Sequence, residues 1–317
     1  RTMGVIQKRL YTLWPARSRF FCGGRCLTGG ENECPVLSSN VSGPTICAWS
    51  FILIPFTVYA IFVLPRVWKN LHPVIALASV GVFVLTVTML LSTCCSDPGI
   101  LPRRALVLAA GTRDELSDIL GYNILGEDVL VDHPTGITED SARIPQRLRE
   151  RGYKYCRTCE IIRPPRASHC PSCDHCILRF DHHCPFVNNC VGQRNYAYFT
   201  GFVSSALCLA LTVLPLLFWW MSTAGMDGGS DSPIEDSRLK MGLLVLGILV
   251  GIVAVALLGL WCYHMFLVAT NQTTKEHRRQ SIQNQSEEPT LCAPRGPRLF
   301  DPRAWIDVQM DGGRIRG

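Results

Sequence analysis

Residues 156–190 hold a density of soft metal ligands that few protein cores need. The order is Cys-x2-Cys-x9-His-Cys-x2-Cys-x2-Cys-x4-Asp-His-His-Cys-x5-Cys, from Cys156 to Cys190. Zinc in closed structural sites takes four ligands, and three cysteines with one histidine is a common set. A Cys-x2-Cys pair lets two sulfurs reach one ion, and such pairs begin at Cys156 and at Cys170. The pattern therefore predicts two zinc sites.

Two such sites would use eight ligands and leave one of the seven cysteines over. Composition alone does not say how the eight ligands divide, so the two sites could be sequential or interleaved. The stretch has few large aliphatic side chains, and we therefore expect metal binding to supply most of its folding free energy. A cluster of reduced structural thiols without metal is the alternative.

The run Asp181-His182-His183-Cys184 offers a nucleophile, a base and a group to orient the base within four residues. A thiol reacts as its thiolate, and a neighbouring histidine lowers its pKa. Nucleophile, base and orienting group form the general arrangement of covalent catalysis. We therefore expect Cys184, His182 and Asp181 to be catalytic. The alternative is that Cys184 is a spare zinc ligand and Asp181 caps a turn, because adjacency in sequence does not by itself give the geometry.

Four nearly charge-free segments flank this stretch in two pairs. They run over Thr45–Leu64, Pro73–Thr93, Tyr198–Met221 and Met241–Val268. A helix needs about 20 apolar residues to cross a bilayer, so the sequence predicts four transmembrane helices with about a hundred polar residues between the pairs. Buried helices of a soluble protein are the alternative, which is disfavoured because four such runs rarely occur together in one soluble chain.

The basic residues indicate which side of the membrane each part faces. Six Lys/Arg precede the first segment, thirteen lie between the pairs and eight follow the fourth, while the two short connectors hold four. Cytoplasmic loops carry the excess of Lys and Arg, so both ends of the chain and the cysteine-rich stretch are expected in the cytosol. The net charge of +6 indicates contact with an anionic leaflet. Nucleic acid is not expected as a partner, because no recognition motif accompanies the charge.

The cysteine-rich stretch resembles the DHHC family of membrane protein S-acyltransferases, or palmitoyltransferases. The resemblance covers every signature position from Cys156 to Cys190, followed by Asn195 and Phe199. Asp97-Pro98-Gly99 is similar to the family's Asp-Pro-Gly motif, and Thr273-Thr274-Lys275-Glu276 is similar to its Thr-Thr-x-Glu motif. The four-helix layout also fits this family.

The resemblance implies an interleaved ligand set and a role for each remaining residue. One zinc would be held by Cys156, Cys159, His169 and Cys176, and the other by Cys170, Cys173, His183 and Cys190. Cys184 would be the acylated nucleophile, His182 its general base and Asp181 the residue that orients the base. Thr274, rather than Thr273, would contact Asp181. The implied cofactors are two structural Zn²⁺ ions, and the implied acyl donor is palmitoyl-CoA, with the acyl chain among the four helices.

Two features resemble the branch of the family that acylates Ras together with an accessory subunit. They are Phe21-Cys22-Gly23-Gly24-Arg25 and the run from Arg163 to His169. The implied partners are therefore cytosolic or peripheral membrane proteins, Ras-like GTPases among them, and an accessory subunit. The chain also departs from the family: Phe186 stands where most members have Trp, and residues 280–317 lack the C-terminal Asn/Tyr motif.

The sequence thus predicts an all-α membrane protein with a cytosolic zinc-binding, cysteine-rich domain between the second and third transmembrane helices. The expected parts are a cytosolic N-terminal segment (1–44), two transmembrane helices (45–93), a cytosolic linker (94–152), the zinc domain (153–197), two transmembrane helices (198–268) and a cytosolic tail (269–317). We expect it in the endoplasmic reticulum or the Golgi. Cysteines near the membrane ends are expected to be either acylated or unmodified; they are Cys22, Cys26, Cys94 and Cys95.

Two other functions are alternatives to acyl transfer. A transporter or channel is disfavoured because His264 is the only ionisable residue deep in the fourth segment, and transport pathways usually carry more. A non-catalytic, zinc-stabilised membrane scaffold is the main alternative, and the intact Asp-His-His-Cys run counts against it. Arg163, Arg166 and Arg179 are candidates to meet the coenzyme A phosphates, or else they face solvent or lipid.

Overall fold

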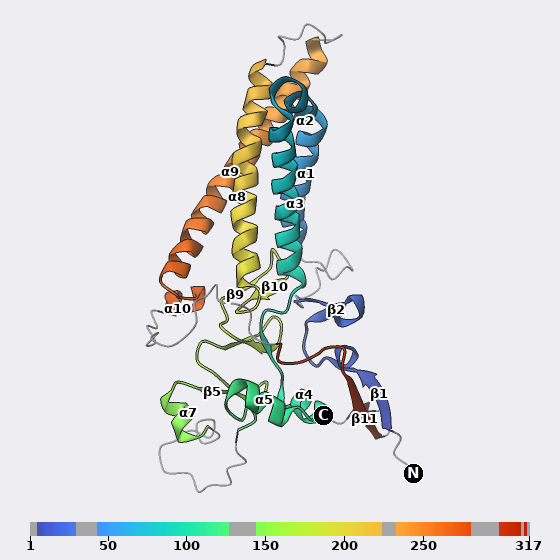
Figure 1. The fold of residues 1–317 in the computed structure, drawn as a ribbon, viewed down its shortest axis with the longest axis vertical. Helices are drawn as coiled ribbons and strands as arrows, with labels where there is room; N and C mark the ends of the chain where they lie inside the picture. The colour runs from blue at the N-terminus through green and yellow to red at the C-terminus, as the bar shows by residue number, and fades with distance from the viewer. Residues whose placement is uncertain are drawn as a thin grey trace. The chain divides into compact units, whose positions relative to one another are not determined.

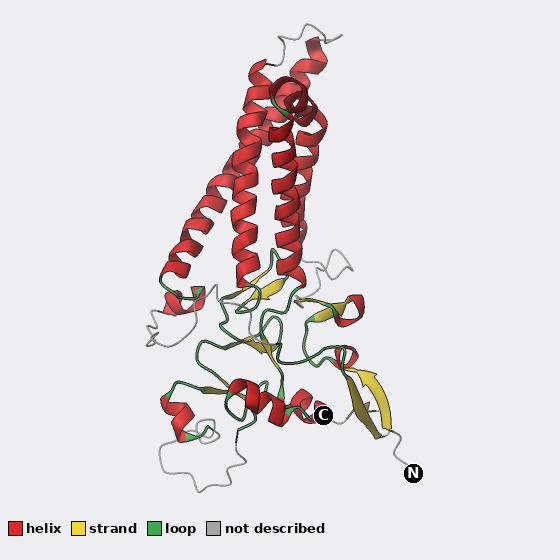
Figure 2. Ribbon diagram, viewed as in Figure 1, coloured by secondary structure: helices red, strands yellow, loops and turns green. Residues whose placement is uncertain are grey.

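The computed structural model describes residues 5–29, 43–126, 144–223, 233–279, 298–311 and 314–315. The chain forms two compact units (Figure 1). The helical unit comprises Ser42–Thr93 and Ala197–Thr270, and the cysteine-rich unit comprises Arg1–Val41, Cys94–Tyr196 and Asn271–Gly317. The described fold is mostly helical, with four long helices and many short strands (Figure 2).

The helical unit is built from four apolar helices, as the sequence predicts. They are α1 (Gly43–Val58), α3 (Pro73–Cys95), α8 (Tyr196–Thr223) and α9 (Pro233–Ala269). Four spans that include these helices are long and apolar enough to cross a membrane; they are Gly43–Leu71, Pro73–Cys95, Tyr196–Thr223 and Ser237–Ala269. Their shared core includes Phe56 of α1 stacked on Phe83 of α3, with ring centroids 3.8 Å apart. Only 11% of the apolar window of α9 is buried, so hydrocarbon must cover the rest of that helix.

The first membrane span is longer than the sequence indicates. It runs through Pro65 to Leu71, past the expected boundary at Leu64. Proline removes a backbone donor and its ring crowds the preceding turn of a helix. Here two wider π-helical turns, η3 (Tyr59–Val63) and η4 (Val67–Leu71), lie on either side of the proline. The short segment between them is α2, Leu64–Arg66. The helix continues through the proline instead of ending there.

Short helices and strands make up the cysteine-rich unit. The helices are α4 (Arg104–Ala110), α5 (Arg113–Leu120), α7 (Gln146–Glu150) and α10 (Thr274–Arg279). The central strands are β4 (Ile100–Leu101), β5 (Lys154–Cys156), β6 (Ile161–Arg163), β7 (Ser168–Cys170), β8 (His175–Ile177), β9 (His182–Cys184) and β10 (Asn189–Val191). They pair antiparallel as β5–β6, β4–β8–β7 and β10–β9.

The segments from both ends of the chain also form strands in this unit. β1 (Val5–Arg9) pairs antiparallel with β11 (Trp305–Asp311), and β12 (Arg314–Ile315) extends that sheet. β2 (Arg19–Phe21) and β3 (Cys26–Thr28) form a hairpin, and the short helix η2 (Cys22–Gly24) joins them. The short helix η1 (Leu10–Leu13) precedes β2. The segment expected to be a cytosolic tail therefore supplies a strand to a sheet.

An aliphatic core supports the cysteine-rich unit beside its metal-ligating residues. Ile161 and Ile162 of β6 are fully buried and pack with Leu116 of α5 and with Ile124. Burying one such side chain stabilises a fold by about 1.5–3 kcal/mol. Metal binding is therefore not the only source of stability in this unit, because the linker preceding the cysteine-rich stretch brings apolar side chains to it.

Candidate zinc clusters and active site

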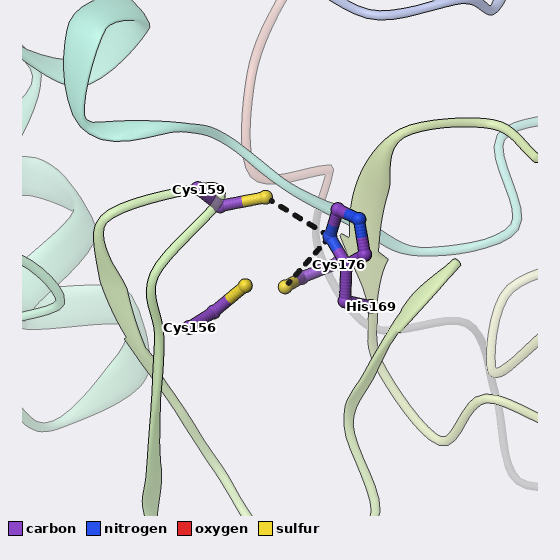
Figure 3. Close-up of side chains that lie close together, drawn as sticks. All are labelled: Cys156, Cys159, His169 and Cys176. Atoms are coloured by element: carbon purple, nitrogen blue, oxygen red, sulfur yellow. Dashed lines mark hydrogen bonds between the residues drawn. The ribbon is translucent and has the colours of Figure 1, made fainter. Parts of the chain in front are cut away.

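The first cluster joins Cys156, Cys159, His169 and Cys176, whose ligand atoms all lie within 4.8 Å of one another (Figure 3). His169 Nδ1 lies 3.4 Å from the Sγ of Cys159 and 4.0 Å from the Sγ of Cys176. Strand pairing explains the approach, because β7 and β8 place His169 directly opposite Cys176. Glu160 adopts a left-handed φ of 52°, which turns the chain back after the Cys-x2-Cys pair.

The second cluster joins Cys170, Cys173, His183 and Cys190, also within 4.8 Å. His183 Nδ1 lies 3.4 Å from the Sγ of Cys173 and 3.5 Å from the Sγ of Cys190, and the two sulfurs are 3.4 Å apart. β9 and β10 pair so that Cys190 faces His183. The two clusters are interleaved: His169 and Cys170 are neighbours on β7, yet they join different clusters.

Both clusters are suitable for zinc. Zn–S bonds of about 2.3 Å and Zn–N bonds of about 2.0 Å in a tetrahedron require ligand atoms roughly 3.5 Å apart. The separations of 3.4–4.0 Å between ligand atoms match that requirement. Three thiols and one imidazole buried together need a cation to neutralise the thiolates, and zinc prefers this donor set.

An outer carboxylate supports the first cluster. Asp174 Oδ1 lies 3.6 Å from His169 Nε2, on the ring nitrogen that faces away from the sulfurs. Arg103 in turn holds the Asp174 carboxylate, with its guanidinium nitrogen 2.6 Å from Oδ2. Such carboxylate–histidine pairs fix the tautomer and orientation of a ligating imidazole. Neither residue is predicted from the sequence, since no spacing rule links Arg103 to Asp174.

His175 is another histidine of the stretch that the sequence analysis left without a role. It belongs to neither cluster and is 1% exposed. Burial lowers its pKa to about 3, so the ring is neutral, and its Nδ1 lies 3.4 Å from the Ser18 hydroxyl. His175 therefore helps to fasten the N-terminal segment to β8.

Asp181, His182 and Thr274 form one hydrogen-bonded chain. His182 Nδ1 lies 2.6 Å from Asp181 Oδ2. The carboxylate also accepts two hydrogen bonds from Thr274, one from the backbone N–H at 2.7 Å and one from the hydroxyl at 2.8 Å. The Asp181 side chain is fully buried. Its two oxygens are therefore held in place, and the imidazole that they contact is oriented by them.

Strand β9 explains why His183 belongs to the second cluster while its neighbours His182 and Cys184 do not. Successive side chains of a strand point to opposite faces, and alternate side chains share a face. His183 of β9 therefore points to the second cluster, while His182 and Cys184 share the other face and form a side-chain hydrogen bond. Because Nδ1 of His182 is bound to Asp181, Nε2 is the nitrogen left for the Cys184 thiol. Cys184 belongs to neither cluster.

The comparisons with known proteins agree with this geometry. Residues 149–281 match the DHHC palmitoyltransferase family model. The chain is 30% identical to palmitoyltransferase ZDHHC9 of Bos taurus, over 98% of this chain and 84% of that relative. It is 32% identical to palmitoyltransferase ZDHHC18-B of Danio rerio, over 94% of this chain and 76% of that relative.

The chain belongs to the DHHC palmitoyltransferase family. The resemblance stated from the sequence is thereby confirmed, and so are a four-helix membrane fold and the two cysteine–histidine clusters suited to zinc. The chain is also 34% identical to the probable protein S-acyltransferase 2 of Arabidopsis thaliana, over 86% of this chain. It spans about 62% of the length of that relative.

The Thr-Thr-x-Glu motif of this DHHC protein is a capping box at the start of α10. Thr273 Oγ1 accepts the Glu276 N–H at 3.2 Å, and Glu276 Oε2 accepts the Thr273 N–H at 2.7 Å. Such reciprocal bonds satisfy backbone donors at a helix start. Thr273 therefore shapes the turn, and it is Thr274 whose N–H and hydroxyl meet Asp181.

Arg166 ties this capping box to the cysteine-rich stretch. Its guanidinium donates to both Glu276 oxygens, at 2.8 and 3.1 Å, and to the Asn271 carbonyl at 2.8 Å. The Arg166 side chain is 6% exposed, and Arg179 is also 6% exposed. Arg166 and Arg179 were candidates from the sequence for binding the coenzyme A phosphates. Their burial makes both arginines poorly suited to that role. Arg166 instead holds α10 and thereby Thr274.

The Asp-Pro-Gly motif fastens the chain where it leaves α3. Asp97 Oδ1 accepts the N–H groups of Gly99 and Ile100 at 2.8 and 3.0 Å. Its other oxygen lies 3.2 Å from Arg194 Nε. Gly99 has a φ of 108°, a conformation that is strained for residues with a Cβ atom but not for glycine. The motif is therefore a turn anchored on the loop after β10, and it positions the strand that follows.

Asp181, His182 and Cys184 shift one another's pKa values. Burial lowers the pKa of His182, but its hydrogen bonds to Asp181 and Cys184 outweigh burial and raise that pKa to about 9. Burial raises the pKa of the Cys184 thiol, yet the contact with His182 leaves it below its usual value. Burial likewise raises the pKa of Asp181, and the bonds from His182 and Thr274 bring it below its usual range. The arrangement favours a thiolate beside an imidazolium.

Proposed function

We propose that this protein transfers a long-chain fatty acyl group, palmitoyl, from acyl-coenzyme A to cysteines of proteins through an acyl-enzyme on Cys184. One observation carries the proposal: the thiol that neither metal cluster uses is hydrogen-bonded to His182, which Asp181 holds at 2.6 Å. Membership of the DHHC palmitoyltransferase family supports the same reaction class. The catalytic residues of the proposal are Cys184, His182, Asp181 and Thr274, with Thr274 acting through Asp181.

The proposed reaction has two thioester exchanges. His182 takes the proton of the Cys184 thiol, and the thiolate attacks the carbonyl of the acyl-coenzyme A thioester. The coenzyme A thiolate leaves and takes up the proton. A thiolate of the protein substrate then attacks the acyl-enzyme, and Cys184 leaves as a thiolate. General-base catalysis of this kind contributes roughly 10²–10⁴-fold. Zinc would hold the two cysteine–histidine clusters closed and so fix β9.

The long apolar helices suit this protein to a lipid-soluble donor. Each buried methylene contributes about 0.8 kcal/mol, so a palmitoyl chain gains on the order of 11 kcal/mol in an apolar phase. A soluble zinc domain alone would not offer that phase. The four spans supply it, since their outward faces carry many exposed apolar side chains.

The location and the partners follow from charge and from motif resemblance. The excess of Lys and Arg outside the short connectors supports a cytosolic position for both ends of the chain and for the cysteine-rich unit. We propose the endoplasmic reticulum or the Golgi as the membrane. Ras-like GTPases as substrates and an accessory subunit rest on Phe21–Arg25 and on the run from Arg163 to His169.

Labelling with a donor tests the proposal. Purified full-length protein in detergent is mixed with radiolabelled palmitoyl-coenzyme A, and a hydroxylamine-labile adduct is expected on the wild type and absent from Cys184→Ser. Cys208→Ser is the control, because Cys208 is a free cysteine of α8 that belongs to neither cluster. Equal labelling of wild type and Cys184→Ser contradicts the nucleophile assignment. An unlabelled wild type with two bound zinc ions favours the scaffold alternative.

A further inference from the structure

The open end of the β2–β3 hairpin lies against the second cysteine–histidine cluster. The strand register pairs Arg19 with Thr28, so Ser18 and Gly29 come next, at the end opposite the turn. Together with Arg17 they form the hairpin base. Ser18 and Gly29 are both buried, although much of the hairpin itself is exposed. This burial indicates that the hairpin base packs against the rest of the cysteine-rich unit.

Two backbone hydrogen bonds connect the hairpin base to the two halves of the second cluster. On one side, the Arg17 N–H donates to the carbonyl of Cys173, a ligand residue, at 3.2 Å. On the other side, the Gly29 N–H donates to the Asn188 carbonyl at 2.6 Å. Asn188 ends the turn between β9 and β10, the strands that carry the histidine and the last cysteine of the cluster. The hairpin base therefore bridges the two chain segments that supply this cluster.

The Ser18 side chain adds a contact behind the first of these segments. Its hydroxyl lies 3.4 Å from His175 Nδ1, and His175 pairs with Cys170 in the β7–β8 register. Cys170 is a ligand residue of the second cluster. All three contacts of the hairpin base are therefore made with ligand residues of the second cluster or with residues beside them.

Position 29 has no room for a side chain. A Cβ atom there would lie 2.8 Å from the Asn188 carbonyl oxygen and 3.1 Å from the Cys173 sulfur. Both separations are shorter than the roughly 3.5–4.0 Å of favourable contact between non-bonded heavy atoms. Glycine thus lets the backbone approach both halves of the cluster at once. It also covers the sulfur of Cys173, which is fully buried.

We propose that the hairpin base is a clamp that retains zinc in the second cluster, with Gly29 as the positioning residue that closes it. Release of the ion requires the two ligand-bearing segments to move apart, and the hydrogen bonds of Arg17 and Gly29 oppose that movement. The cover over the Cys173 sulfur also keeps competing ligands away from the thiolate. The proposal rests on the ligand set proposed for the second cluster and not on acyl transfer.

The clamp also contacts the turn that follows Cys184. This turn is closed by a 3.3 Å hydrogen bond from the Val187 N–H to the Cys184 carbonyl. A second 3.3 Å bond runs from the Asn188 N–H to the Pro185 carbonyl. Asn188 has a left-handed φ of 46°, and its carbonyl accepts the Gly29 N–H. Opening the clamp should therefore loosen this turn together with the cluster.

The test follows the protection of each cysteine by zinc in the full-length, zinc-loaded protein in detergent. The protein is incubated with a zinc chelator and N-ethylmaleimide, and alkylated peptides are quantified over time by mass spectrometry. In Gly29→Ala, we expect the initial alkylation rate of the second-cluster thiols to rise about 10–100-fold, as for other outer partners of metal ligands. The first-cluster thiols should follow later, because the two clusters are interleaved. The two sets are Cys170, Cys173 and Cys190 for the second cluster, and Cys156, Cys159 and Cys176 for the first.

Gly43→Ala is the matched control, because a Cβ atom at Gly43 meets no atom within 4 Å, and it should react at the wild-type rates. Ser18→Ala is a second variant, which removes only the hydroxyl contact to His175. Its second-cluster thiols should also be alkylated before those of the first cluster, with a smaller rise in rate. Ser18→Ala decides alone if Gly29→Ala does not fold.

Two results would overturn the clamp. One is wild-type alkylation rates for the second-cluster thiols in both Gly29→Ala and Ser18→Ala. The other is simultaneous alkylation of both sets of thiols from the start in these variants, which indicates general unfolding. Because the readout is thiol protection and not acyl transfer, either result leaves the proposed acyltransferase function untouched.

Discussion

Thr274 donates two hydrogen bonds to Asp181, one from its backbone N–H at 2.7 Å and one from its hydroxyl at 2.8 Å. These residues are 93 positions apart in the chain, separated by two membrane spans. Thr274, at the start of α10 beyond the fourth span, thus holds the carboxylate that contacts His182. We therefore expect activity to depend on the structure of α10.

Removing the Thr274 hydroxyl should slow acylation while leaving the fold intact. A hydrogen bond to a charged group contributes about 1.5–3 kcal/mol, and the backbone N–H of Thr274 remains in the variant. We expect Thr274→Val to label from palmitoyl-coenzyme A about tenfold more slowly, with unchanged zinc content. Thr270→Val is the control, because its hydroxyl bonds only to carbonyls of α9. Equal rates for Thr274→Val and wild type would contradict the role of this hydroxyl.

Arg166 and Glu276 should behave as one unit. Removing one partner leaves a buried charge without its counterion, which costs roughly 3–5 kcal/mol. We expect Arg166→Met and Glu276→Gln each to lower the melting temperature and the labelling rate. The double variant should be no worse than either single one, with a coupling energy of about 0.5–3 kcal/mol.

The exposed pair Arg303 and Asp301, 3.3 Å apart with both side chains 51% exposed, provides the matched control. Ion pairs on the surface contribute about 0–1 kcal/mol to stability. In a double-mutant cycle on Arg303 and Asp301, the two single changes in stability should therefore nearly add up to that of the double variant. If the losses of stability in Arg166→Met and Glu276→Gln simply add in the double variant, the Arg166–Glu276 ion pair does not hold α10.

Asp174 should tune the zinc affinity of the first cluster. Asp174 is an outer carboxylate 3.6 Å from His169 Nε2, and changing an outer partner of a ligating histidine typically lowers metal affinity 10–100-fold. Asp174→Asn is expected to lose zinc to a competing chelator at a 10–100-fold lower chelator concentration. Asp118→Asn, an exposed aspartate on α5, should match the wild type. An unchanged competition curve for Asp174→Asn would show that the Asp174 carboxylate does not affect zinc affinity.

Interleaving predicts that the two zinc ions are lost together. Residues of the β7–β8 hairpin ligate both clusters, and His169 and Cys170 are adjacent. We expect Cys170→Ser, purified from cells, to hold less than one zinc per chain by elemental analysis and to unfold at a lower temperature. Two zinc ions retained in this variant would be incompatible with the proposed ligand set.

The sequence predicted the two cysteine–histidine clusters better than the contacts that hold them in place. Ligand spacing indicates the clusters because that signal is local, and the reactivity of Cys184 stays a prediction. His182 and Cys184 meet because they alternate with His183 on one strand, and β9 is too short to show a strand pattern in sequence.

The remaining parts depend on contacts between distant segments. Arg166 is a candidate for the coenzyme A phosphates from sequence, yet the fold brings it to Glu276, 110 positions away. Leu116 and Ile124 lie in the segment expected to be a linker, yet they are in the core of the unit. The first span passes through Pro65 because π-helical turns flank it, which proline alone does not predict.

The most direct test of the central claim follows one acyl group through both steps. The wild-type protein is mixed with palmitoyl-coenzyme A, its peptides are mapped by mass spectrometry, and a cysteine-containing acceptor peptide is then added. We predict palmitate on Cys184, lost as the acceptor gains it, and no transfer by Cys184→Ser. A wild type without palmitate on Cys184, or acceptor acylation at the wild-type rate by Cys184→Ser, would contradict the account.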